Sequence, residues 1–534
     1  MSSTRRVDAV VVGAGFAGLY MLHKLRSEGF SAVVFEAGDD VGGTWYWNRY
    51  PGARCDVESM EYSYGFDEEL EQTWEWTERY ASQPEILRYA NHVADRFDLR
   101  RDIQFQTRVT AATFTEASST WRVRTDRGHD VVGQFLVMAT GCLSSANTPE
   151  ISGAATFAGS SFHTGTWPHE GVDFTGQRVG VIGTGSSAIQ SIPLIAEQAR
   201  ELTVFQRTAS FAVPAWNQAL DPRAVKELKA EYQTFRAEQR QTATGFGSRI
   251  KGGDGSALDA APDELSRELQ RRWDYGGLSF LGAYNDLLID NQANDLAAHF
   301  VRAKLREIVN DPAVADKLAP TQVIGCKRLC VDTGYWATFN RPNVHLVDLR
   351  DDPIEAITPA GIRTTTGEHS LEAIVYATGF DAMTGALLRI DITGRGGLSL
   401  QEAWAAGPRT YLGLGVAGFP NLFTITGPGS PSVLTNMLVS IQHHVEWIAD
   451  CIGHLRQNHL AAIEATEPAQ EAWVDYVNTV ASFTLFPTCN SWYLGANVPG
   501  KTRVFMPLPG FPPYAEHCAH VARSGYEGFA LTTP

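Results

Sequence analysis

Cysteine is scarce in this sequence, and long hydrophobic runs are absent from it. The 534 residues include seven cysteines, a small and odd number, so a disulfide framework is not expected and a reducing compartment is indicated. No run of about 18 apolar residues occurs, so no segment is expected to cross a bilayer. These absences together predict a cytoplasmic protein that does not span a membrane.

The cysteines that stand near possible partners also have ordinary interpretations. Cys326 and Cys330 do not have the spacing of a redox CxxC pair, so both are interpreted as structural thiols. Cys518 lies between His517 and His520, but no second pair of ligands accompanies it. A surface turn is therefore favoured there over a metal site, and no bound metal is expected.

Positive charge is also in deficit. Lys and Arg number 44 against 60 Asp and Glu, a formal net charge of −16, so the chain repels phosphate backbones and anionic headgroups. Neither nucleic acid nor a membrane surface is expected as a partner. What remains is an ordinary globular composition, with 44% hydrophobic and 19% charged residues. At ~150 residues per domain, the length predicts two to four domains.

The first of two glycine fingerprints follows the apolar run that ends at Val12. In Gly13-Ala14-Gly15-Phe16-Ala17-Gly18 the first glycine permits a tight turn, the second lets a pyrophosphate approach, and the third lets a helix pack closely on the strand. The next predicted strand ends in Glu36, whose carboxylate would bind a ribose diol and repel a 2′-phosphate. This site is predicted to bind FAD or NAD.

The second fingerprint, Gly183-Thr184-Gly185-Ser186-Ser187-Ala188, has a different ending. Its following strand leads to Gln206-Arg207-Thr208, where an arginine can fork onto a 2′-phosphate and a threonine can donate a hydroxyl bond. NADPH is therefore predicted to bind here. The competing interpretation is that Arg207 is a solvated charge at the end of a strand. Hydride transfer from NADPH to a flavin then makes FAD the better choice for the first site. The small and aromatic residues Gly42-Gly43-Thr44-Trp45 fit a flavin neighbour.

The order of these segments predicts an α/β fold with two Rossmann-like dinucleotide-binding domains and a helical insertion. The insertion is charged and helical in pattern, with Asn294 as the expected N-cap of one helix. Strand-and-turn texture then returns, and Ala377-Thr378-Gly379 repeats the earlier Ala139-Thr140-Gly141. The predicted ranges are 1–141 and 380–534 for the FAD-binding domain, 142–220 and 321–379 for the NADPH-binding domain, and 221–320 for the insertion.

The segment between the fingerprints resembles the F-x-G-x-x-x-H-x-x-x-W-P signature of Baeyer-Villiger monooxygenases. It supplies Phe157, Gly159, His163, Trp167 and Pro168 at that spacing. Gly42 to Gly52 and Ser491 to Asn497 extend the resemblance, which covers nearly the whole chain and is closest to the phenylacetone and steroid members. Ala188 stands where relatives often have Gly. The competing interpretation of the signature is that His163 and Trp167 form a packed core pair in a linker between domains.

The resemblance implies roles for individual residues. It makes Arg328 and Asp56 catalytic, although an Arg54–Asp56 surface pair and two solvated charges at Lys327-Arg328 are the alternatives. Phe157, Gly159, His163 and Trp167 are implied to couple domain movement to catalysis. The residues implied to bind FAD are Gly13, Gly15, Gly18, Glu36, Thr44, Trp45, Asp56, Tyr62 and Met437. Those implied to bind NADPH are Thr184, Gly185, Ser186, Ser187, Gln190, Arg207, Thr208, Lys327 and Trp492.

The implied reaction inserts one oxygen atom of O2 beside a ketone carbonyl through a C4a-peroxyflavin, giving an ester or lactone, with sulfoxidation as a further activity. The loop from Gly427 to Leu434 implies room for aryl, cyclic or bulky steroid-like ketones. A monomer or weak homo-oligomer is expected. The alternatives are a flavin monooxygenase that oxidises only nitrogen or sulfur, and an NADPH-sensing binding protein. A disulfide reductase would need a cysteine pair beside the first flavin segment, where none occurs.

Overall fold

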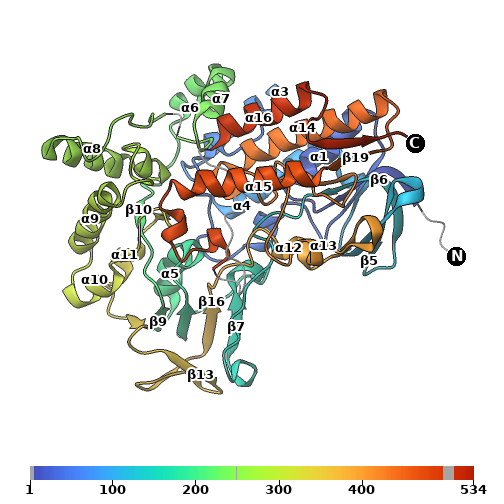
Figure 1. Ribbon diagram of the computed structural model, residues 1–534. Coiled ribbons are helices and arrows are strands. Elements are labelled where there is room, and N and C mark those ends of the chain that lie inside the picture. The colour runs from blue at the N-terminus through green and yellow to red at the C-terminus, as the bar shows by residue number, and fades with distance from the viewer. Residues whose placement is uncertain (1–4, 248, 497–509) are drawn as a thin grey trace.

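The computed structural model describes residues 5–247, 249–496 and 510–534. Its mixed α/β fold contains two main sheets that lie beside each other (Figure 1). The helices between residues 262 and 318 lie at one side of the molecule, whereas those between residues 222 and 241 pack with the first sheet's helices (Figure 1). The first sheet has the order β17-β4-β5-β6-β1-β2-β3, and β18 also pairs with β6. The second sheet has the order β12-β9-β8-β16-β7. The predicted fold class is confirmed.

The first sheet is covered on both faces, which explains its continuous apolar strands. Alternate residues of β1 enter different cores: Ala9 and Val11 pack with helices α1 and α14, while Val10 and Val12 pack toward β4 and β5. The strands are β1 (Arg5–Val12), β2 (Ala32–Phe35), β3 (Ile103–Gln104), β4 (Val109–Thr115), β5 (Thr120–Thr125), β6 (Asp130–Met138), β17 (Asp391–Thr393) and β18 (Leu422–Thr424).

Helices of the first sheet come from both ends of the chain. Helix α1 packs against α14, although the two lie far apart in sequence (Figure 1). The elements of this part are α1 (Phe16–Ser27), α2 (Thr44–Trp47), α3 (Glu68–Thr73), α4 (Gln83–Arg96), α12 (Gly385–Leu388), α13 (Leu400–Ala403), α14 (Met437–Gln457), β19 (Ala462–Ala465), α15 (Glu467–Ser482), α16 (Phe511–Arg523) and β20 (Phe529–Thr532).

The second sheet is parallel and centred on β8. Val179 and Val181 of β8 enter one apolar core, and Ile182 and Ile374 enter another on the opposite face. Its strands are β7 (Ser160–His163), β8 (Arg178–Ile182), β9 (Glu201–Gln206), β12 (Val344–Asp348) and β16 (Ala373–Tyr376), accompanied by helices α5 (Ser186–Gln198) and α11 (Tyr335–Thr338). Two small separate sheets are the parallel pair of β10 (Ala212–Pro214) and β11 (Cys330–Asp332), and the antiparallel sheet of β13 (Ile354–Thr358), β14 (Gly361–Thr364) and β15 (Glu368–Ser370).

The helices between the two parts of this sheet are α6 (Pro222–Ala230), α7 (Tyr232–Gln241), α8 (Pro262–Tyr275), α9 (Asn291–Ile308) and α10 (Pro312–Leu318). Asp290, not Asn294, caps α9, because its Oδ1 accepts the N–H groups of Gln292 and Ala293. Asn294 is buried inside the helix, and its amide donates to the carbonyls of Leu287 and Ile324. The predicted cap was wrong by one helical turn.

The interpretation of Cys326 as a structural thiol was also wrong. Cys326 is bonded to Cys489, 163 positions away in sequence, and the other five cysteines are free and buried. Spacing along the chain gives no information about so distant a partner, and the inference of a reducing compartment loses this support. Cys518 lies buried in α16 and not in a surface turn.

The chain passes from the first sheet to the second after β6 and returns after β16. The two crossing segments pair with each other: Asn147 N donates to Gly379 O at 2.9 Å, and Met383 N donates to Cys142 O at 2.7 Å. An antiparallel bridge joins Ala146 to the returning segment. The repeated Ala-Thr-Gly in the sequence marks where each crossing begins, so the crossings form one short two-stranded ribbon.

Within the described residues, no helix combines the length and the apolar character that crossing a membrane requires.

Candidate active site

A cavity of about 1610 Å³ lies between the two sheets, beyond the carboxyl ends of β1, β6, β8 and β16. Parallel sheets place ligands at this edge. The volume exceeds the roughly 300–1,000 Å³ of an ordinary ligand pocket, so it has room for more than one ligand. All of the residues predicted to bind FAD or NADPH line it except Gly18.

The glycines of the first fingerprint are required by close backbone approaches. A Cβ on Gly13, whose φ is +104°, would lie 2.6 Å from the carbonyl oxygen of Ala139. A Cβ on Gly18 would lie 1.8 Å from the carbonyl oxygen of Gly13, so only glycine lets α1 pack this closely on β1. Gly18 is therefore a packing residue, while Gly13 and Gly15 face the cavity.

Glu36 stands where the fingerprint predicts a carboxylate. Its side chain is buried, and its two oxygens accept the N–H groups of Ala14 and Gly38, each at 2.7 Å. Burial raises the pKa of this carboxyl, which the backbone donors oppose. Nearby, Trp45 donates its indole N–H to the hydroxyl of Tyr62 at 3.1 Å, and both rings line the cavity.

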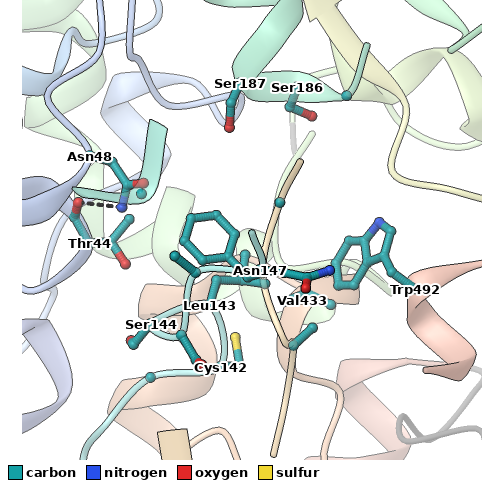
Figure 2. Close-up of a pocket in the computed structure, with 18 of the residues that line it drawn as sticks. Thr44, Asn48, Cys142, Leu143, Ser144, Asn147, Ser186, Ser187, Val433 and Trp492 are labelled. Atoms are coloured by element: carbon teal, nitrogen blue, oxygen red, sulfur yellow. Dashed lines mark hydrogen bonds between the residues drawn. The ribbon is translucent and has the colours of Figure 1, made fainter. Parts of the chain in front are cut away.

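The second fingerprint faces the same cavity from the opposite side. No side chain caps α5, and a Cβ on Gly185 would enter open space, so the first N–H groups of the helix can meet an anion. Ser186 and Ser187 lie at this helix start, across the cavity from Cys142 to Asn147 (Figure 2). Thr184 Oγ1 donates to the carbonyl of Thr208 at 2.6 Å, which joins the fingerprint to the end of β9.

Two cations share this wall. Lys327 is half-buried, and its pKa is lowered by burial and further by the positive charge of Arg207. Two like charges that repel each other in one cavity are stabilised when an anion binds between them. Gln190 also lines the cavity, but its amide is engaged by the hydroxyl of Tyr50 at 2.9 Å and the carbonyl of Arg54 at 3.1 Å. It therefore connects α5 to the first part of the chain.

Arg328 and Asp56 form a two-point ion pair in the cavity, although they are 272 positions apart. Nε lies 2.5 Å from Oδ2 and Nη2 lies 2.9 Å from Oδ1, while Nη1 donates to Val433 O at 2.6 Å. Burial lowers the pKa of Arg328, but the charge of Asp56 outweighs it and raises that pKa overall. Arg54 pairs with Glu78 instead, so the alternative Arg54–Asp56 pair is wrong.

An apolar cluster adjoins this ion pair. It contains Cys142, Ala382, Met383, Val433, Phe486 and Tyr493, with Leu143, Leu434, Met437 and Trp492 packed against it. Val433, Trp492 and the 142–147 segment surround one part of the cavity (Figure 2). Burial raises the pKa of Tyr493, and the positive charge of nearby Arg328 opposes that shift. A fixed positive charge therefore borders an apolar wall.

Comparison with known proteins identifies the family. Residues 10–261 match the family described as Pyridine nucleotide-disulphide oxidoreductase. A Baeyer-Villiger monooxygenase of Pseudooceanicola batsensis is 43% identical over 524 residues, covering 97% of this chain and 95% of its own. The chain belongs to the Baeyer-Villiger monooxygenases. Cyclohexanone 1,2-monooxygenase of an Acinetobacter species is 40% identical, covering 99% of this chain and 98% of its own. Phenazine N-monooxygenase PhzNO1 of Lysobacter antibioticus is 41% identical, covering 98% of this chain and 97% of its own.

Solved structures of the family agree with this fold. An oxidised steroid monooxygenase bound to NADP is 53% identical with a TM-score of 0.95, covering 99% of this chain and 100% of that one. OTEMO in complex with FAD and NADP is 41% identical over the same shares, also with a TM-score of 0.95. Cyclohexanone monooxygenase has been solved in closed, open, loose and rotated forms. This monooxygenase accordingly has FAD and NADPH as cofactors, and the two glycine turns, the uncapped α5 and the large cavity fit two dinucleotides.

The signature residues of the family lie beside the cavity rather than in its wall. His163 Nδ1 accepts the N–H of Gly165 at 2.9 Å, and Nε2 lies 3.3 Å from Thr378 Oγ1. Thr378 in turn donates to the carbonyl of Asn147 at 2.6 Å. His163 therefore contacts the returning segment directly and is linked to the outgoing one through Thr378, and burial lowers its pKa.

Trp167, Phe157 and Gly159 have packing positions. Trp167 is buried against Phe162 and Phe174 in the core of the second sheet. Phe157 packs at the edge of the core on the opposite face. A Cβ on Gly159 would lie 2.3 Å from the carbonyl of Glu372, so a larger residue does not fit. Trp167 is packed in a core, as the competing interpretation expects, whereas His163 lies beside the ribbon.

Sequence reasoning missed several residues of the site. The carbonyl of Val433, the hydroxyl of Tyr493 and the crossing segment from Cys142 to Asn147 were not assigned roles. The repeated Ala-Thr-Gly was the one available signal for the crossing. Asn497, at the end of a motif that extends the resemblance, lies outside the described residues.

We expect His163→Ala to lower turnover and the fraction of NADPH that yields product, while FAD content stays near that of the parent. The reason is that His163 contacts the ribbon and not the cavity, and movements between domains often limit turnover. His129→Ala, which removes an exposed histidine in the turn between β5 and β6, is the control. The measurements are bound flavin per chain, kcat and product per NADPH. Loss of flavin in the His163 variant would assign it a structural role instead.

Proposed function

We propose that this enzyme inserts one oxygen atom of O2 beside the carbonyl of an aryl, cyclic or bulky ketone, with Arg328 as the catalytic cation. The observation that carries the proposal is the ion pair of Arg328 with Asp56 beside an apolar wall. When bound, FAD would take a hydride from NADPH and activate O2 for transfer to the ketone. The product would be an ester or lactone.

Arg328 would stabilise the negative charge that develops on the ketone oxygen. Of its five N–H donors, three are engaged by Asp56 and Val433, which leaves two that could meet substrate. Because the carboxylate and the carbonyl hold the guanidinium in place, little reorganisation is needed when charge develops. Preorganised charge of this kind supplies ~3 kcal/mol or more.

The remaining residues would position the cofactors. Gly13, Gly15, Glu36, Thr44, Trp45, Tyr62 and Met437 would hold FAD, with Gly18 supporting the turn. The pyrophosphate of NADPH would be bound by Thr184, Gly185, Ser186 and Ser187, and its 2′-phosphate by Arg207 and Thr208. The rest of NADPH would contact Lys327 and Trp492. Gln190 would join α5 to residues 50–54. This assigns residues 1–141 and 380–534 to FAD, 142–220 and 321–379 to NADPH, and 221–320 to the insertion.

A second candidate activity is oxidation of a heteroatom. This candidate is supported by the relative named phenazine N-monooxygenase PhzNO1, which is 41% identical to this chain. Oxidation of a sulfur atom belongs to the same proposal. The cation beside the apolar wall favours the ketone reaction, since a nitrogen or sulfur atom develops no oxyanion for Arg328 to stabilise. A cytoplasmic location and a monomeric or weakly associated state complete the proposal.

Arg328→Ala should separate the two halves of the reaction. Reduction of bound FAD by NADPH should remain within about three-fold, because stacking of the two cofactors does not need the guanidinium. Ester formation should fall about 100-fold or more, with hydrogen peroxide released instead, because the developing oxyanion loses its cation. Arg328→Lys should restore little, since an ammonium cannot form the two-point contact with Asp56.

These effects are measured by anaerobic stopped-flow reduction and by aerobic ester yield from a ketone. Arg122→Ala is the matched control, because Arg122 forms an exposed ion pair with Asp130 on the first sheet. Near-normal ester yield in the Arg328→Ala variant would defeat the proposed role, as would failure already at FAD reduction.

Arg207→Ala should remove most of the preference for NADPH over NADH. Charge-assisted bonds to a phosphate contribute ~1.5 to 3 kcal/mol, so the ratio of the two kcat/KM values should fall about 10-fold to 100-fold. Arg200→Ala, which removes an exposed arginine paired with Glu372, is the control. An equal loss with both coenzymes would show that Arg207 does not bind the 2′-phosphate.

The ketone pocket should accept aryl and fused-ring ketones as well as small rings. The loop from Gly427 to Leu434 is irregular and ends in a single 3-10 turn, and Val433 borders the cavity. Val433→Phe should therefore lower kcat/KM for fused-ring ketones by about 10-fold, a cost of roughly 1.4 kcal/mol, and spare cyclopentanone. NADPH consumption with product analysis measures both; reaction of small rings alone would contradict the assignment.

A further inference from the structure

A covalent bond connects two segments that carry proposed active-site residues. The disulfide joins Cys326 to Cys489, and both residues line the cavity. Cys326 directly precedes Lys327 and Arg328, while Cys489 is followed closely by Trp492. The state of this bond therefore bears on how the cation and the apolar wall lie relative to each other.

The two ends of the bond belong to different packing units. Ile324 and Leu329, on either side of Cys326, lie in the core of the second sheet and the insertion. Phe486 and Tyr493, on either side of Cys489, belong to the apolar cluster at the ribbon. A backbone hydrogen bond from Leu485 N to Leu288 O at 2.9 Å adds a noncovalent tie to the same insertion. The disulfide thus adds a covalent connection to the two that the crossing segments make.

A connection at this place restrains relative movement of the two units. A ribbon allows its ends to rotate, but a second covalent tie across the cavity limits that rotation. Cyclohexanone monooxygenase, a relative, has been solved in closed, open, loose and rotated forms, so the fold is compatible with more than one arrangement. In this chain, the disulfide would narrow that range.

We propose that Cys326 and Cys489 are a reversible redox site: the oxidised pair holds residues 485–496 against Lys327 and Arg328 and slows turnover, and the reduced pair releases this segment. Both cysteines are less than one-tenth exposed, so the oxidant is a small molecule that enters through the cavity. Hydrogen peroxide has that size. The effect on turnover rests on the proposed function, whereas the bond and its effect on the segment do not.

The redox step is balanced. One cysteine sulfur attacks an oxygen of hydrogen peroxide, the O–O bond breaks, and a sulfenic acid and one water form. The second thiol then attacks that sulfur, the S–S bond forms, and the hydroxyl leaves as a second water. Two electrons pass from the sulfurs to the peroxide. A small dithiol reverses the reaction by exchange and becomes a cyclic disulfide.

The test compares the intact holoenzyme after treatment with hydrogen peroxide and after treatment with dithiothreitol. Peptide mapping without reduction should find the Cys326 and Cys489 peptides joined only after oxidation. Backbone amides of residues 485–496 should exchange hydrogen at least about ten-fold faster in the reduced protein, because release of the segment raises its local opening. Turnover with a ketone should rise about three-fold on reduction.

Cys326→Ser and Cys489→Ser should each give the fast exchange and fast turnover of the reduced protein whatever the oxidant. Cys451→Ala removes a buried free cysteine of α14 that is no part of the pair, and should keep the redox response. Seven free thiols after peroxide treatment, or equal exchange in both states, overturns the inference. Redox-dependent exchange without ester formation from any ketone would refute the proposed function and leave this inference standing.

Discussion

The ion pair between Arg328 and Asp56 is the constraint on which the site depends. It joins residues 272 positions apart, and its two contacts fix the plane of the guanidinium. Placing a guanidinium in a partly enclosed cavity costs solvation free energy, and a well-oriented carboxylate is needed to offset that cost. The pair therefore links the loop that carries Asp56 to the segment that leads into β11, and a displacement of either segment would separate the charges.

Other contacts across the cavity support that arrangement. Gln190 of α5 bonds to Tyr50 and to the carbonyl of Arg54, close to Asp56 in sequence. Val433 supplies its carbonyl to Arg328 from a loop in which Ser432 has a positive φ of 42°. An irregular backbone is needed here, since a helical carbonyl would be engaged within its own helix. Two separate segments thus hold Arg328 directly, and Gln190 supports the one that carries Asp56.

Local chemistry was predictable from the sequence, and long-range contacts were not. The glycines at 13, 15 and 18 and the carboxylate of Glu36 act through neighbours a few residues away or in the next strand, so their spacing carried the prediction. The Cys326–Cys489 bond depends on how distant segments pack, which no spacing reveals. The predicted cap at Asn294 was wrong because Asp290, one turn earlier, is an equally good N-cap residue. The buried contact of Asn294 with the carbonyl of Ile324 places Asn294 inside the helix.

The ribbon explains why residues outside the cavity can matter to the chemistry inside it. His163 contacts Thr378, which bonds to Asn147, so one buried side chain is linked to both crossings. Cys142 at the start of the same ribbon packs in the apolar cluster beside Arg328. A rotation about the ribbon would therefore move the apolar wall and the cation at the same time. This is the physical basis on which we propose that a residue which sets the ribbon geometry, although it lies outside the cavity, influences the position of the apolar wall relative to Arg328.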